Sequence, residues 1–67
     1  MNANEKCRAA EALLHENGLP GARVRAEGHA EEIAAVNVPP ESVAKLAALA
    51  PAIKALGFRY VALDLSE

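Results

Sequence analysis

The chain has 67 residues, of which 52% are hydrophobic and 3% aromatic, and its formal net charge is −2. This length predicts one small domain over residues 1–67, and much of its apolar content is alanine, so the core must be thin. The charge excludes the basic surface that a sequence-independent nucleic-acid binder needs, so we expect no nucleic-acid partner.

The remaining composition bears on compartment and assembly. No apolar run approaches the roughly 20 residues of a membrane span, and the first residues lack a secretory pattern, so we expect no membrane partner and a cytoplasmic location. The lone Cys7 excludes an intramolecular disulfide, which fits a reducing compartment. A core of this size rarely contributes more than about 3–5 kcal/mol, which favours a homo-oligomer.

Residues 4–17 are predicted to form the first helix. Asn2 or Asn4 can cap its start, and Gly18 can end it because glycine tolerates the left-handed conformation. One face has helical spacing and comprises Cys7, Ala10, Leu13, Leu14 and Asn17.

Residues 22–26 and 33–38 alternate in polarity or present apolar residues on one side, which is typical of strands. A short turn containing Gly28 separates them, so the two strands are predicted to form a hairpin. In the second strand, Ala34, Val36 and Val38 share one face.

Pro39 and Pro40 fit the start of a second helix, where a missing N–H costs nothing. Pro51 must break or kink that helix, so we expect two pieces, at 41–49 and 51–56. Gly57 ends the second piece, and the inner face of a last strand follows, formed by Val61, Leu63 and Leu65.

The predicted fold class is α+β: an α-β-β-α-β order forming a three-stranded, mainly antiparallel sheet with the helices packed on one face. A right-handed return from the second helix would place the last strand beside the first. The other face would be uncovered, and it is the candidate binding or assembly surface. It would carry Arg23, Arg25, Ile33, Ala35, Asn37, Tyr60, Ala62 and Asp64.

Two residue pairs are candidate ligands. Arg23 and Arg25 lie about 7 Å apart on one side of a strand, which suits an anion such as phosphate, although pairing with Asp64 or Glu27 on a solvated face is the alternative. Glu11 and His15 are one helical turn apart, as in half of a metal site, but no third ligand is evident and we expect no metal.

Cys7 has two interpretations, a small apolar residue on the helix face or a reactive thiol near Lys6 and Arg8. The first is favoured because a reactive thiol needs an exposed, electropositive setting. No nucleophile–base pair is visible, so we expect no catalytic residue and no cofactor.

The segment IKALGFRYVALDL, residues 53–65, resembles a C-terminal segment of the ATP-dependent sacrificial sulfur transferases, the LarE-type members of the PP-loop ATP pyrophosphatase superfamily. Three other stretches are similar to that family's C-terminal domain, in order: residues 5–14, 22–25 with Gly28-His29, and 33–41. The family inserts sulfur during synthesis of a nickel-pincer nucleotide cofactor. The resemblance implies a phosphate or ligand role for Glu11, Arg23 and Arg25.

This chain departs from the family in several places. It has no Ser-Gly-Gly-x-Asp-Ser phosphate loop, Cys7 does not match the sacrificial cysteine, and Asn37 replaces a family glutamate. We therefore expect a non-catalytic accessory domain that acts as a homo-oligomer or in trans with a separate PP-loop ATP pyrophosphatase subunit. The alternatives are a fragment of a full sulfur transferase and a ferredoxin-like ligand-binding regulatory module.

Overall fold

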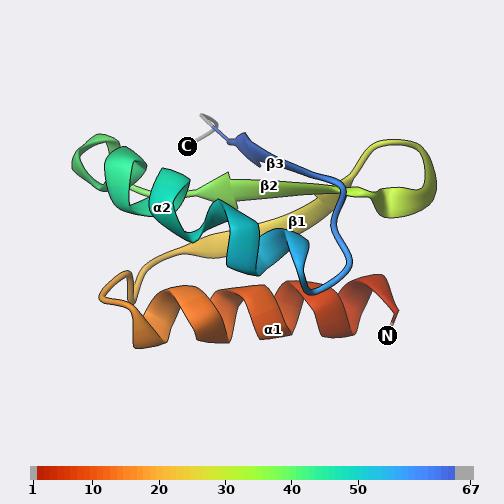
Figure 1. The fold of residues 1–67 in the computed structure, drawn as a ribbon, viewed down its shortest axis with the longest axis horizontal. Helices are drawn as coiled ribbons and strands as arrows, with labels where there is room; N and C mark the ends of the chain where they lie inside the picture. Colours follow the sequence, from red (N-terminus) through yellow and green to blue (C-terminus); the bar gives the residue numbers. More distant parts are fainter. Residues whose placement is uncertain (1, 65–67) are drawn as a thin grey trace.

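The computed structural model describes residues 2–64, and their order is the predicted α-β-β-α-β (Figure 1). The main elements are α1 (Ala3–Glu16), β1 (Arg23–Glu27), β2 (Ile33–Asn37), α2 (Val43–Lys54) and β3 (Tyr60–Leu63). Two short 3₁₀ turns, η1 (His29–Glu31) and η2 (Pro40–Ser42), lie before β2 and α2. The α+β class is confirmed, while the predicted inward position of Leu65 lies outside the described residues.

The ends of α1 follow from local chemistry. The Asn2 side chain accepts a 2.9 Å hydrogen bond from the Glu5 N–H and caps the first turn. At the other end Gly18 has a φ of +87°, and the Leu19 N–H donates to the Leu14 carbonyl at 2.9 Å, which closes the helix in a Schellman motif. The predicted apolar face is only partly in the core: Ala10 and Leu14 are buried, Cys7 and Leu13 half-buried, and Asn17 exposed.

The three strands form a mixed open sheet in the order β1-β2-β3. β1 and β2 form the predicted antiparallel hairpin, whereas β2 and β3 are parallel. The prediction that the last strand lies beside the first is wrong. The outer edge of β1 is occupied by side chains of α1, so the strand that returns from α2 can add only beside β2 (Figure 1).

The second helix is not divided at Pro51, so the prediction of two pieces is wrong. α2 runs without interruption from Val43 to Lys54 and begins after η2 rather than at residue 41. Pro51 has no N–H to donate to the carbonyl of Ala47, four residues earlier. Both residues are exposed, so water can hydrate that carbonyl. Leu46 and Ile53 are buried on either side of the proline and hold the helix against the sheet.

Both helices pack on one face of the sheet, as predicted. The buried cluster joins apolar side chains from all layers: Ala10, Leu14, Val24, Ala34, Val36, Leu46, Ile53 and Phe58. No element of residues 2–64 covers the opposite face of the sheet. This open face and the sheet edges are therefore where a function should be sought.

Candidate functional site: the open sheet face and its edges

The strand register brings the predicted surface residues together on the open face. Arg25 of β1 lies beside Ala35 of β2, which lies beside Ala62 of β3. Arg23 is opposite Asn37 in the same pattern. A further row across the sheet is formed by Glu27, Ile33 and Tyr60. The prediction that these side chains share one face is therefore correct, although β3 was predicted beside β1 and lies beside β2.

Arg25 is engaged in ion pairs on this face. Its Nη2 lies 3.1 Å from Asp64 Oδ2, with hydrogen-bond geometry, and 3.7 Å from Glu27 Oε2. Asp64 and Glu27 are the two acidic residues that the sequence offered as partners if the arginines do not bind an anion. The guanidinium is thus already neutralised within the chain, which argues against Arg25 as a free phosphate ligand.

The Arg25–Asp64 pair crosses the sheet from its first strand to the end of its third. To reach Asp64, the arginine side chain must pass over β2 on the side where Ala35 lies, since adjacent strands are about 4.8 Å apart. Ala35 is only 8% exposed although it belongs to the open face. This predicted interface residue is therefore largely covered within the chain, whereas Tyr60 and Ala62 are exposed.

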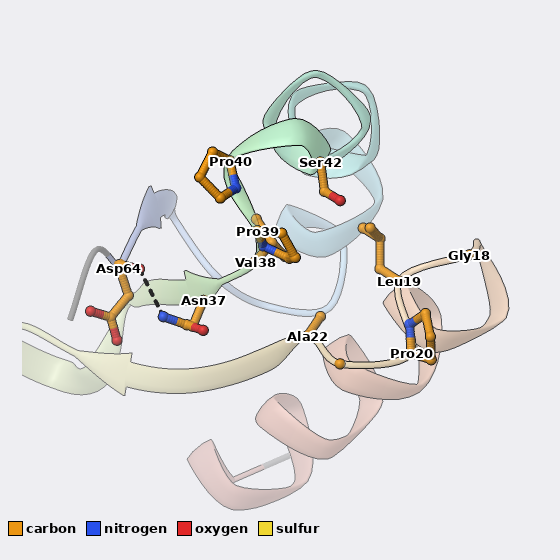
Figure 2. A pocket seen from close by; sticks show the side chains of 11 residues that line it. Gly18, Leu19, Pro20, Ala22, Asn37, Val38, Pro39, Pro40, Ser42 and Asp64 are labelled. Atoms are coloured by element: carbon orange, nitrogen blue, oxygen red, sulfur yellow. Dashed lines mark hydrogen bonds between the residues drawn. The ribbon is translucent and has the colours of Figure 1, made fainter. Parts of the chain in front are cut away.

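Asp64 is held by three separate groups. Besides the ion pair, its N–H donates to the Val36 carbonyl at 2.8 Å, and its own carbonyl accepts a 3.1 Å bond from Asn37 Nδ2 (Figure 2). Its side chain is only 14% exposed. Asp64 therefore joins β1, β2 and β3 at one end of the sheet and acts as a structural residue there.

Arg23 differs from Arg25 because it is exposed and forms no ion pair with any residue from 2 to 64. It begins β1 and follows Ala22, one of the residues that line a hollow of about 500 Å³ at the end of the sheet (Figure 2). That hollow is lined by residues 18–22, 37–40, Ser42 and Asp64, and three of its residues are prolines. Of the two arginines that the resemblance groups together, only Arg25 is ion-paired within residues 2–64.

Glu11, the third residue of that group, has a different role. Its Oε2 accepts a 2.9 Å hydrogen bond from the backbone N–H of Val24, and His15 Nε2 lies 3.1 Å from the Ala22 carbonyl oxygen. Ala22 and Val24 are two residues apart, so both groups lie on the outer edge of β1. The Glu11 and His15 side chains thus contact backbone groups along the β1 edge.

Cys7 lies one turn before Glu11 and extends the same row along β1. Burial raises the pKa of its thiol, and the charges of Glu11 and Glu31 raise it further, whereas the Ala26 backbone N–H and Lys6 oppose this shift. The thiol is half-buried and surrounded mainly by groups that disfavour a thiolate. This environment supports the apolar interpretation of Cys7.

The free edge of the sheet is β3. All four of its residues are exposed or half-buried, whereas the central three of β2 are buried. Tyr60 is 52% and Leu63 38% exposed, and they point to opposite faces. β3 is therefore the least covered apolar element of the sheet. The sequence had already assigned Tyr60 and Ala62 to the candidate assembly surface, but it gave no sign that Leu63 is exposed, because Val61, Leu63 and Leu65 follow the pattern of an inner face.

Among residues 2–64, no three His, Cys, Asp or Glu side chains are grouped so that they could hold a metal ion. Within the same range, neither helix has the length and apolarity needed to cross a bilayer. No model of a known protein family matches the chain, and no curated protein matches it.

Proposed function

We propose that this chain is a non-catalytic assembly domain that associates with a second copy of itself through β3. The observation that carries the proposal is the exposure of this strand: its sequence Tyr-Val-Ala-Leu contains no charge and no proline, yet no residue of it is buried. Natural edge strands are usually protected by such residues or by covering elements. An apolar edge without them is a surface to which another chain can add.

The size of the protein gives a physical reason for association. Three residues of the buried core cluster are alanines, Ala10, Ala22 and Ala34, which contribute little apolar area. Each square ångström of apolar surface removed from water stabilises by about 25 cal/mol. Covering Tyr60 and Leu63 would therefore bury apolar area that the thin core does not supply.

Light scattering coupled to size-exclusion chromatography, over a concentration series, tests this proposal. We expect the wild-type protein to show twice the 7.0 kDa mass of one chain at the upper end of the series. Leu63→Glu should shift the equilibrium toward the monomer. Val43→Glu is the matched control, because Val43 is also 38% exposed but lies on α2. A wild-type protein that stays monomeric throughout would overturn the proposal.

A second candidate function is docking on a separate PP-loop ATP pyrophosphatase subunit, with Arg23 offered to a phosphate. Arg23 is exposed, forms no ion pair with residues 2–64 and follows Ala22 of the hollow, which favours this function, as does the resemblance to the accessory domain of a sulfur transferase. Titration with inorganic pyrophosphate, followed by NMR, should then shift the amide signals near Arg23. The shifts should disappear in Arg23→Ala and persist in Arg8→Ala, where an exposed arginine of α1 is removed. Equal shifts in both variants would exclude a site at Arg23.

A further inference from the structure

We infer that the second copy adds at the free edge of β3 as an antiparallel strand, with a two-fold axis at Ala62. The two sheets would then join into one continuous sheet of six strands, three from each copy. The inference rests on the proposed function, and it specifies the residues and the register through which the copies meet.

The backbone of β3 has free groups on one side only. The Tyr60 N–H donates to the Glu32 carbonyl at 3.2 Å, and the Asp64 N–H donates to the Val36 carbonyl at 2.8 Å. In a strand, successive residues direct their backbone groups to opposite sides, so those of Val61 and Leu63 face away from β2. No other element within residues 2–64 lies beyond that edge (Figure 1).

The other edge of the sheet cannot take part. At that edge the Val24 N–H donates to Glu11, and His15 lies 3.1 Å from the carbonyl oxygen of Ala22, just before β1, so α1 blocks the addition of a second copy's β3 there. Head-to-tail addition of β3 to β1 would generate an open fibre, whereas β3 against β3 closes after two copies. The covered β1 edge thus selects the two-fold pairing.

The side chains of β3 are self-complementary in one register. With the axis at Ala62, Val61 of one copy lies opposite Leu63 of the other, in pairs whose outward backbone groups exchange hydrogen bonds. Tyr60 lies opposite Asp64 of the second copy, and Ala62 lies opposite its own equivalent. No like charges are opposed, and the apolar pairs continue the core side of the sheet.

Neighbouring registers are less favourable. An axis at Val61 would place the Arg59 side chain opposite Leu63 of the second copy. An axis at Leu63 would place the Asp64 carboxylate opposite Ala62 of the second copy. Among residues 60–64, the Ala62 register places Val61 opposite Leu63 and Tyr60 opposite Asp64, so no charged side chain there lies opposite an aliphatic one.

Cross-linking tests the register. In a non-hydrogen-bonded antiparallel pair the Cα atoms are about 4.5 Å apart, which lies within the range that a disulfide can join. Ala62→Cys in a Cys7→Ser background should therefore form a covalent dimer on mild oxidation. Ala44→Cys, at an exposed position of α2, is the control and should not. Equal cross-linking of the two variants would overturn the register.

Charge substitution separates this inference from the proposed function. Ala62→Lys and Ala62→Glu should each be monomeric, because like charges meet at the axis, and a mixture of the two should recover a dimer. Ala62 is exposed, so both variants should keep the circular dichroism spectrum of the wild-type protein. If the wild-type protein is monomeric, the proposed function fails with the inference. If it is dimeric and both charged variants remain dimeric, only the inference fails.

Discussion

The Glu11 carboxylate on α1 accepts a 2.9 Å hydrogen bond from the backbone N–H of Val24 on β1. The contact belongs to a row in which the next helix turn, at His15, meets Ala22. Four helical residues rise about 6 Å and two strand residues about 6.6 Å, so successive turns match alternate residues of the strand edge. Side chains of the helix thereby bond backbone groups at the edge of β1, as a neighbouring strand would.

Removing this contact should destabilise the fold and expose the β1 edge. We expect Glu11→Ala to lower the free energy of unfolding by about 1–2 kcal/mol, because a backbone N–H loses a charged acceptor. Urea unfolding at a fixed protein concentration measures the change. Glu16→Ala, at an exposed position of the same helix, should cost less than about 0.5 kcal/mol. Equal losses in the two variants would show that the Val24 contact contributes nothing.

The Arg25–Asp64 pair should contribute little, despite its 3.1 Å separation, because the arginine side chain is 60% exposed. A double-mutant cycle of Arg25→Ala and Asp64→Asn should give a coupling free energy of about 0.5–1 kcal/mol that declines as salt is added. Arg23→Ala combined with Asp64→Asn provides the matched cycle and should show no coupling. A coupling for Arg23 as large as that for Arg25 would contradict the ion-pair assignment.

Pro51 is tolerated within α2 at a cost that substitution should recover. Pro51→Ala supplies an N–H to the Ala47 carbonyl, so we expect the free energy of unfolding to rise by about 1–3 kcal/mol. Thermal unfolding measures the gain. Pro40→Ala is the comparison, since Pro40 begins η2 and its missing N–H has no partner to lose. A neutral Pro51→Ala would mean that the helix has already relaxed around the proline.

The thiol of Cys7 should react slowly at neutral pH. Its raised pKa leaves less thiolate than an unhindered cysteine has, so the iodoacetamide rate should increase only at higher pH. Glu11→Gln removes a charge that raises this pKa, and the rate profile should then move to lower pH. A profile that coincides with that of a short cysteine peptide would contradict the burial of the thiol.

The sequence predicted the local features because they depend on neighbours along the chain. The Asn2 cap, the Gly18 helix end and the alternation that separates Arg23, Arg25 and Tyr60 from Val24 and Val36 all follow from backbone geometry within a few residues. Pro51 is an exception. The predicted break at Pro51 considered the helix in isolation. In the folded protein, packing of Leu46 and Ile53 on the sheet keeps α2 in one piece.

Helical and strand periodicity in the sequence was enough to predict the α-β-β-α-β order, the α+β class and which strand residues share a face. It could not predict that β3 lies beside β2, that Glu11 bonds the β1 edge or that Arg25 pairs with Asp64. Each of these depends on distances between segments far apart in the chain, which no local pattern encodes. The occupied edge of β1 and the open edge of β3 arise from that same packing.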